Sequence, residues 1–184
     1  MQNVRSSEFS FDSASDLNRR HRILALAWIA AVGLVYLLRA NREGFWFDEV
    51  MTVTHCALPF KQMIAARAAA GHAPLYFVLM WVWQRLFGDG EIVTRLPSIF
   101  FGIGSLWALF ALVRRQASAE AGLWAALFLG LHQMLFTWSA QARMYTLMLL
   151  LALACLHAVA VLEREHRPGA WLGLLCASLA LAYT

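Results

Sequence analysis

The feature that most constrains this chain is a series of long runs without a charged side chain. Five such runs occur, at residues 23–38, 96–113, 121–142, 144–162 and 168–184. A helix needs about 20 apolar residues to cross the bilayer hydrocarbon, with a range of roughly 17–25, and residues at its ends can snorkel to the interface. Because backbone groups in lipid must be paired internally, the runs predict an all-α, polytopic membrane helical bundle with five transmembrane helices.

Composition supports a membrane protein and excludes other classes. Hydrophobic residues make up 61% of the 184 residues and charged residues 14%, whereas soluble domains carry roughly 45–50% and about 25%. A disordered chain is therefore excluded and an ordinary soluble domain is disfavoured. The net charge of +4 comes from basic residues at the ends of the apolar runs, so no nucleic-acid partner is expected. The three cysteines form no CxxC pair and predict neither a disulfide scaffold nor a zinc site.

The distribution of arginine favours one orientation. A further apolar segment, 74–87, is short enough to be either a sixth span or an interfacial helix. If it does not cross and the N-terminus is cytoplasmic, the cytoplasmic arginines are Arg19, Arg20, Arg22, Arg114, Arg115, Arg164 and Arg167. A sixth span would move the last four of these outside. The positive-inside rule therefore favours five spans, with residues 40–94 as one long outer loop.

The two ends of the sequence differ in character. Residues 1–18 are polar and rich in Ser, so we expect a flexible cytoplasmic tail before a transmembrane domain at 19–184. The last apolar run stops at Thr184 without the cap or basic residue that usually ends a helix. We therefore expect a truncated chain that continues in the complete protein.

Two adjacent carboxylates, Asp48 and Glu49, follow the first predicted span in the aromatic sequence FWFDEV. A carboxylate that loses hydration near the bilayer surface has a raised pKa and accepts a proton more readily. This predicts a general base with a candidate metal ligand beside it. The alternative is a helix start, with Asp48 as N-cap and Glu49 favoured by the helix dipole. The two interpretations are compatible, and both stay open.

Other polar residues gather at the predicted outer ends of the spans. His72 precedes the interfacial helix, where an imidazole can donate to an anion, and Tyr76 follows in the same motif. Arg143 is the only charge between two long runs, and a guanidinium matches phosphate oxygens in a bidentate manner. Arg143 and Arg95 can equally act as helix anchors at the membrane boundary. The segment 58–71 is typical of an amphipathic surface helix, and plain structural packing is the alternative interpretation.

The order of these motifs resembles the GT-C superfamily of membrane glycosyltransferases. The resemblance covers about residues 20–184 and rests on the DE pair, HAPLYF, RLPS, RR and ARMY, in that order. It is strongest to the N-terminal part of the family 39-like group, with protein O-mannosyltransferases, lipid A aminoarabinose transferases and Rgt-type bacterial transferases. It implies a helical bundle with juxtamembrane helices in a long first outer loop. It also implies transfer of a sugar from a polyprenyl-phosphate donor on the outer side, usually with inversion. The likeness to the Rgt-type bacterial transferases implies a plasma (inner) membrane.

The resemblance assigns roles to particular residues. Asp48 matches the general base of the family, and Glu49 matches its neighbour, with a structural or cation-binding role. Gln141 stands where many relatives carry an acidic residue, and an amide cannot supply the charge of a carboxylate to a divalent cation. A divalent cation is thus left open, and no other cofactor is implied. The expected substrate-binding residues are His72, Tyr76, Arg95, Gln141, Arg143 and Tyr145.

Two other functions stay open beside the glycosyltransferase. One is a non-catalytic membrane scaffold or an inactive truncated relic. The other is a small transporter subunit, which would carry polar groups along a path through the membrane midplane, whereas the polar groups here gather at the outer ends of the spans. For the enzyme, the expected partners are a polyprenyl-phosphate sugar donor, membrane lipid, and an acceptor lipid, glycan or protein.

Overall fold

The computed structural model describes residues 2–42, 44–165 and 167–184, with side chains from residue 16 onward. Every secondary-structure element in these ranges is a helix, which confirms the predicted all-α class. The elements are α1 (Gln2–Ala40), α2 (Phe47–Ala57), α3 (Phe60–Ala69), α4 (Leu75–Phe87), α5 (Glu91–Gln116), α6 (Ala119–Leu131), α7 (Gln133–Ser139), α8 (Tyr145–Glu165) and α9 (Pro168–Ala182).

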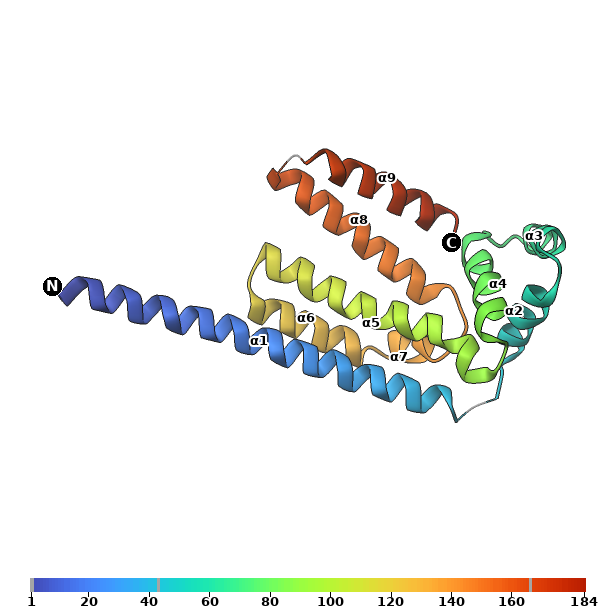
Figure 1. The fold of residues 1–184 in the computed structure, drawn as a ribbon, viewed down its shortest axis with the longest axis horizontal. Coiled ribbons are helices and arrows are strands. Elements are labelled where there is room, and N and C mark those ends of the chain that lie inside the picture. Colours follow the sequence, from blue (N-terminus) through green and yellow to red (C-terminus); the bar gives the residue numbers. More distant parts are fainter. Residues whose placement is uncertain (1, 43, 166) are drawn as a thin grey trace.

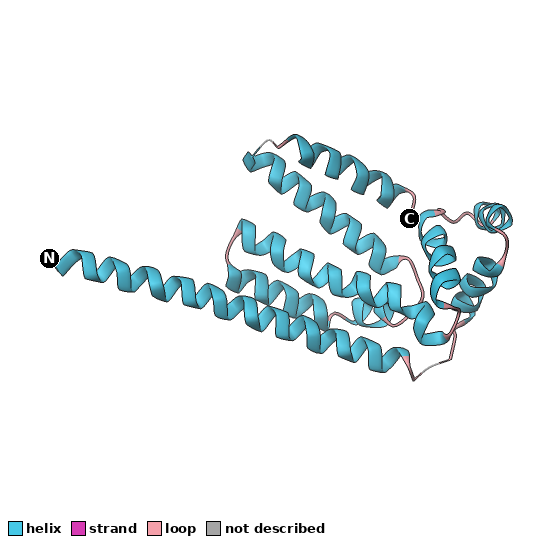
Figure 2. Cartoon of the chain, in the orientation of Figure 1, coloured by secondary structure: helices cyan, strands magenta, loops and turns pink. Residues whose placement is uncertain are grey.

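The helices fall into two groups. The long helices α1, α5 and α8 lie alongside α6 and α9 in one bundle, while α2, α3 and α4 gather at one end of it (Figure 1). Short loops connect neighbouring helices (Figure 2). We name the end that carries α2 the Asp48 end, and the opposite end, where α5 finishes, the Arg115 end. The gathered helices lie in the segment 40–94, where juxtamembrane helices are expected.

Three helical segments are long and apolar enough to cross a membrane: Asp16–Ala40, Glu91–Gln116 and Tyr145–Glu165. A fourth expected span, 121–142, is formed by α6 and α7, which are bent by 65° at the break between them. The shorter apolar helices are Leu75–Phe87 and Pro168–Ala182. The described residues therefore contain three or four candidate spans by length and composition, and a fifth span at α9 stays a prediction.

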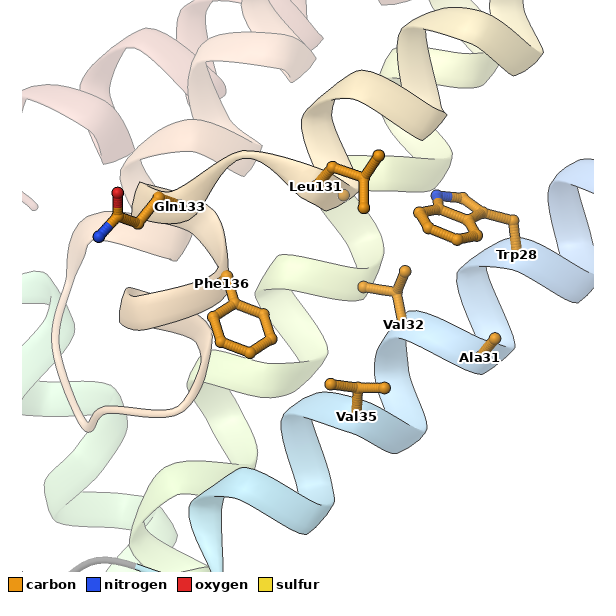
Figure 3. Close-up of a pocket in the computed structure, with 8 residues that line it drawn as sticks. Trp28, Ala31, Val32, Val35, Leu131, Gln133 and Phe136 are labelled. Carbon is orange, nitrogen blue, oxygen red and sulfur yellow. The ribbon is translucent and has the colours of Figure 1, made fainter.

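The bend between α6 and α7 is centred on His132. Its backbone is extended, and its imidazole Nδ1 accepts a hydrogen bond of 3.3 Å from the Met134 N–H, so it caps a new helix rather than continuing the old one. Beside the bend, a groove of about 400 Å³ opens between α1 and the α6–α7 pair. Figure 3 shows Trp28 and Val35 of α1 lining this groove opposite Phe136 of α7.

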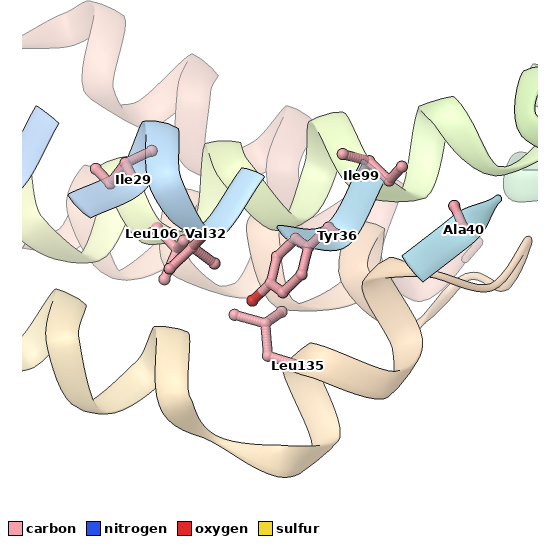
Figure 4. Close-up of a cluster of buried hydrophobic side chains, with 7 residues drawn as sticks. All are labelled: Ile29, Val32, Tyr36, Ala40, Ile99, Leu106 and Leu135. Atoms are coloured by element: carbon pink, nitrogen blue, oxygen red, sulfur yellow. The ribbon is translucent and has the colours of Figure 1, made fainter. Parts of the chain in front are cut away.

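A buried apolar cluster holds α1 against α5 and α7 (Figure 4). Its members on α1 recur every three or four residues, which places them on one face of the helix. Figure 4 shows Tyr36 of α1 lying next to Leu135 of α7. This packing brings the end of α1 beside the start of α5. The full cluster is Ile29, Val32, Tyr36, Ala40, Ile99, Leu106 and Leu135.

A second cluster joins the helices of the Asp48 end to α8. It consists of Cys56, Met63, Tyr76, Phe77, Met80 and Leu147. The Leu75 N–H at the start of α4 also donates a 2.8 Å hydrogen bond to the Tyr183 carbonyl just after α9. These contacts fix the positions of α2, α3 and α4 over the end of the bundle.

The N-terminal segment differs from the loose tail expected for residues 1–18. Helix α1 runs without a break from Gln2 to Ala40, so residues 2–18 are helical, while residue 1 lies outside the described residues. Residues 2–32 contain neither Gly nor Pro, the two residues least favourable in a helix interior. The cytoplasmic location of this segment stays a prediction.

Candidate active site

Glu49 is a fully buried carboxylate in the first turn of α2. Its Oε1 accepts from Arg95 Nε and the Ala142 N–H, both at 2.8 Å. Its Oε2 accepts from Arg95 Nη2 at 2.7 Å and the Trp46 N–H at 3.0 Å. Burial raises the pKa of Glu49, but the hydrogen bonds from Arg95, Ala142 and Trp46 outweigh it, and the net pKa is lowered. Because each oxygen already accepts two hydrogen bonds, Glu49 is poorly suited to bind a metal ion or to act as a base.

Arg95 is the partner of this carboxylate and has only 1% of its surface exposed. Its Nη1 donates to the Ala40 carbonyl at 2.7 Å, and its Nη2 donates to the Gly44 carbonyl at 2.9 Å. The Glu49–Arg95 pair thus joins the end of α1, the start of α2, α5 and the turn before α8. The structure brings Arg95 to Glu49, in place of the expected contact with a substrate or a lipid headgroup.

Asp48 points in a different direction from Glu49, because adjacent residues of a helix point about 100° apart. The Asp48 side chain is 61% exposed, and its Oδ2 lies 3.4 Å from Arg143 Nη1. The alternative interpretation of Asp48 as the helix N-cap is wrong, since Trp46 occupies that position. The expected dipole contribution of Glu49 does have the right geometry, because its side chain reaches back to the Trp46 N–H. The two neighbouring carboxylates therefore have different surroundings and different chemistry.

Arg143 lies in the turn before α8, with 17% of its side chain exposed. Its Nη2 donates to the Tyr145 hydroxyl at 3.4 Å, and its guanidinium lies 5.5 Å from the Tyr145 ring centroid. The Tyr145 ring stacks on Trp138 with 4.2 Å between centroids. The Arg143 backbone carbonyl accepts from Ser98 Oγ of α5 at 3.2 Å. Contacts from both α5 and α8 thus hold this guanidinium beside Asp48.

His72 precedes α4 and is electrostatically coupled to the same group of charges. Burial lowers its pKa, the nearby positive charges of Arg67 and Arg143 lower it further, and Asp48 opposes them weakly. The ring packs against Phe77 with 5.7 Å between centroids. A pKa below its usual 6.5 leaves the imidazole neutral at pH 7, so it can both donate and accept a hydrogen bond.

Arg67 and its partner His55 were not predicted from the sequence. Arg67 of α3 is 5% exposed, its Nη2 lies 3.1 Å from His55 Nε2, and its Nε has no hydrogen-bond partner. Burial lowers the pKa of Arg67 first, and the neighbouring Arg143 lowers it further. For the segment 58–71 the sequence left a surface helix and plain structural packing open, and the burial of Arg67 favours packing. The available signal was that Arg67 comes four residues after the apolar Met63, on the same helix face.

The remaining predicted residues are less directly placed. Tyr76 is buried within the second cluster with 1% exposure, so it contributes to packing rather than to a surface. Gln141 is part of the turn before α8, where its backbone carbonyl accepts from the Arg143 N–H at 2.8 Å. No group of three or more His, Cys, Asp or Glu side chains able to hold a metal ion occurs among the described residues.

The comparisons with known proteins agree with a membrane glycosyltransferase. The family model described as dolichyl-phosphate-mannose-protein mannosyltransferase matches residues 71–184. The match includes Arg95 and Arg143, whereas Asp48 and Glu49 precede it. No curated protein and no solved structure matches the chain. Because the family model covers more than half of the sequence, this chain belongs to the dolichyl-phosphate-mannose-protein mannosyltransferase family, whose members are membrane glycosyltransferases of the GT-C type.

Proposed function

We propose that this protein transfers a sugar from a polyprenyl-phosphate donor to an acceptor hydroxyl on the extracytoplasmic side of the membrane. The observation that carries the proposal is the pairing of Asp48 with Arg143, an exposed carboxylate 3.4 Å from a mostly buried guanidinium at one end of the bundle. These two groups carry opposite charges, and the reaction needs both a base and a positive group that stabilises the leaving phosphate. Membership of the mannosyltransferase family supports the same reaction class.

The chemistry divides between the two charges. The acceptor oxygen forms a bond to the anomeric carbon as the bond from that carbon to the phosphate oxygen breaks, and the sugar passes through an oxocarbenium-like state. Asp48 takes the proton from the acceptor hydroxyl. The lipid phosphate leaves with the bonding electrons, and Arg143 stabilises its increased negative charge. A single displacement of this kind inverts the configuration at the anomeric carbon. Because the base and the leaving phosphate then lie on opposite faces of the sugar, the 3.4 Å contact between Asp48 and Arg143 opens as the donor enters between them.

The surrounding charges favour an anionic donor. Arg143 and Arg67 lie near His72, and Asp48 is the one carboxylate among the groups that influence His72. Arg67 also presents a buried Nε without a partner. A phosphate bound beside Arg143 would therefore enter a region with excess positive charge.

The buried Glu49–Arg95 pair has a positioning role in this proposal instead of the catalytic and substrate-binding roles expected from sequence. Glu49 accepts from the Ala142 N–H, one residue before Arg143, and lies one residue after Asp48. The pair therefore holds both reacting groups through their chain neighbours. Such rigid support matters because misplacement of a catalytic group by about 1 Å can cost roughly 10²-fold in rate.

The side of the membrane is inferred from the opposite end of the bundle. Arg164 Nη1 donates to the Arg115 carbonyl at 2.8 Å, so the ends of α5 and α8 meet there. Arg114 and Arg167 lie at the same end. The positive-inside rule then makes the Arg115 end cytoplasmic and the Asp48 end extracytoplasmic, in a plasma-membrane protein with a cytoplasmic N-terminus.

The test is sugar transfer by the purified full chain in lipid vesicles, with a panel of labelled polyprenyl-phosphate sugars. Asp48→Asn should lower the initial rate by at least about 10²-fold, because a general base contributes roughly 10²–10⁴-fold. Asp89→Asn is the matched control, since Asp89 is exposed beyond α4 and makes no contact with Arg143. Equal rates for the wild type and Asp48→Asn would exclude Asp48 as the base. A wild type that neither binds nor transfers from any donor would favour the scaffold alternative.

A further inference from the structure

A groove of about 640 Å³ runs along the half of the bundle nearest the Arg115 end. Residues of α5, α8 and α9 line it, and α8 lies between the other two helices because it packs against both. Most of the lining side chains are small or apolar, among them Trp107, Ala111, Leu153, Ala158, Ala170 and Gly173. The groove lies at the opposite end from Asp48 and Arg143, and the mechanism above makes no use of it.

Helix α9 leaves its side of the groove open. It packs beside α8 at the edge of the bundle away from α1 (Figure 1), and none of the residues from Pro168 to Ala182 is buried. A Cβ built at Gly173 meets no atom within 4 Å. Exposed apolar surface of this extent marks an interaction with lipid or with another protein.

The length of the groove matches one leaflet of a bilayer. The α8 residues of the lining begin at Leu153, and α8 ends at Glu165. At 1.5 Å per residue this wall is about 18 Å long, which is close to half of the roughly 30 Å hydrocarbon core. An acyl chain from the leaflet at the Arg115 end can therefore lie along the whole groove.

The mouth of the groove has an excess of positive charge. Arg167 lines it with 73% of its side chain exposed, and no Asp or Glu is found among the described lining residues. The Arg167 Nε lies 2.6 Å from Glu165 Oε2, and Glu165 also pairs with Arg115. Two guanidinium groups thus share one carboxylate, and one positive charge is left over. In the part of the chain that the structure describes, the Nη atoms of Arg167 make no hydrogen bond.

The start of α9 adds to this positive charge. Arg167 is the N-cap residue of α9, so the positive end of the helix dipole lies at the same mouth. Gly169 and Ala170 of the first turn belong to the lining. An occupant that matches both charge and wall has an anionic group at the membrane surface and a hydrocarbon chain directed into the bilayer.

We infer that this groove binds an acyl chain of an anionic phospholipid, with the headgroup phosphate at Arg167. The bound lipid fills the space between α5 and α9, so it is a structural partner of this side of the bundle. The inference goes beyond the proposed function and does not depend on it, because the groove and the Asp48 end lie at opposite ends of the bundle.

Other occupants match the groove less well. A zwitterionic phospholipid has the acyl chain but no net charge to complement Arg167. A second copy of this chain has the same orientation in the membrane, so its own arginines would come to the level of Arg167. His157 is the other polar residue of the described lining, and it precedes the end of α8 by about 12 Å, which is too deep for a headgroup contact.

The test is native mass spectrometry of the purified full chain, titrated in detergent with phosphatidylglycerol or with phosphatidylcholine of the same acyl chains. We expect phosphatidylglycerol to bind about fivefold more tightly, the contribution of one arginine near an anionic lipid surface. Arg167→Gln should remove this preference. Arg114→Gln is the matched control and should keep it, because Arg114 is an exposed arginine at the same end that lies over the Phe110 ring, outside the lining. His157→Leu should keep the preference as well.

The shape of the groove is tested separately from its charge. Gly173→Phe fills the groove and should weaken binding of both phospholipids at least about tenfold, a common penalty for a mismatched hydrophobic pocket. Leu175→Phe places the same ring at an exposed position of α9 outside the lining and should leave binding unchanged. Because a Cβ at Gly173 meets no atom, we expect Gly173→Phe to fold, and its Tm without added lipid checks this.

Several results would overturn the inference. They are equal affinity of the wild type for the two phospholipids, equal preference in Arg167→Gln and Arg114→Gln, and unchanged binding by Gly173→Phe. A polyprenyl phosphate that displaces phosphatidylglycerol at an equal or lower concentration would assign the groove to that lipid class instead. A dimer that dissociates in Gly173→Phe would assign it to a second copy of the chain.

The result is separable from sugar transfer. Asp48→Asn should bind phosphatidylglycerol as the wild type does. If the lipid binds as expected but no sugar is transferred, the proposed function fails while the lipid site stands. If sugar is transferred but the wild type shows no preference for the anionic phospholipid, this inference fails alone.

Discussion

At the scale of single residues, the site shows how two adjacent carboxylates come to have different chemistry. Asp48 projects to the surface beside Arg143, whereas Glu49 projects into the protein and accepts four hydrogen bonds. One position of offset along a helix decides the difference. A carboxylate with unoccupied lone pairs can accept a proton from a substrate, and a saturated one serves to hold its neighbours in place.

Replacing Arg143 tests the stabilisation of the leaving phosphate. We expect Arg143→Gln to lower kcat/KM for sugar transfer by about 10²–10³-fold, as for the loss of one preorganised donor to a developing anion. Arg42→Gln is the control, because Arg42 is an exposed arginine just after the last residue of α1, at the Asp48 end. A similar loss in both variants would show that general positive charge, rather than the placement of Arg143, supports the reaction.

The pKa of His72 reports the electrostatics of the site without requiring turnover. Burial and the charges of Arg67 and Arg143 place this pKa below 6.5, so an NMR titration of labelled histidine should find His72 neutral at pH 7. Removal of one positive charge by Arg67→Gln should raise the pKa. A wild-type His72 that titrates at or above 6.5, or an Arg67→Gln variant with a still lower pKa, would contradict this description.

The same shift predicts a pH dependence of stability. In the window between the lowered pKa of folded His72 and 6.5, the unfolded chain binds more protons than the folded one. The contribution of His72 to folding free energy is therefore full above pH 6.5 and is lost as the pH falls through this window. His72→Gln should reduce that part of the acid sensitivity in thermal denaturation, and an unchanged pH profile would argue against it.

At the scale of elements, the sequence predicted local features well and partners across the fold poorly. The helices in 40–94 and their position at one end follow from charge and hydropathy. The sequence around Arg95, however, is equally typical of an arginine that anchors a helix at the membrane boundary. Its partner Glu49 lies 46 residues away, so the local sequence does not reveal the pair. For the same reason Arg67 was not singled out, because its partner His55 lies on another helix. A single sequence gives no information on which distant element covers a given helix face.

The buried Glu49–Arg95 pair should be a major source of stability for these elements. Removal of one member of a buried ion pair costs about 3–5 kcal/mol, so Glu49→Gln should lower the Tm by roughly 10 °C in a chain of this size. The control is Glu165→Gln, which removes two more exposed ion pairs, with Arg115 and Arg167, each of which should be worth at most about 1 kcal/mol. Equal shifts would mean that burial adds nothing to the Glu49–Arg95 pair.

This contribution should also depend on pH. The pKa of folded Glu49 is lowered from 4.5, so its stabilisation is present above 4.5 and is lost as the pH falls through the folded pKa. The difference in Tm between the wild type and Glu49→Gln should therefore shrink in acid. A difference that is constant down to the acid limit of folding would contradict an ionised Glu49.

Two glycines test how closely the bundle helices pack. A Cβ built at Gly122 of α6 would lie 2.9 Å from the Phe110 carbonyl oxygen of α5, so Gly122→Ala should push the helices apart and lower the Tm. Gly173 of α9 has no atom within 4 Å of a built Cβ. Gly173→Ala should instead raise stability, by up to about 1 kcal/mol from helix propensity. Shifts of the same sign in both variants would contradict the packing of α5 on α6.

At the scale of the whole molecule, the direction of successive helices accounts for the site. The predicted placement of Asp48 and Arg143 at one end of the bundle depended only on the number of crossings between them, and the structure has them 3.4 Å apart. The 65° bend at His132 was not predicted, because residues 121–142 carry no charge and hydropathy does not register a change of direction. The bend forms part of the wall of a cavity beside Tyr145.

The last prediction concerns which end of the molecule faces outward. In a background with Cys56, Cys155 and Cys176 changed to Ala, Asn41→Cys at the Asp48 end should react in intact cells with a thiol reagent that does not cross membranes. Glu120→Cys, exposed at the start of α6 near the Arg115 end, should react only after permeabilisation. Helix α5 crosses the membrane between the two positions, so they should lie on opposite sides. Modification of both from outside would contradict this crossing. Reaction of Glu120→Cys alone would place Asp48 and Arg143 in the cytoplasm, where the acceptor would have to be a cytoplasmic one.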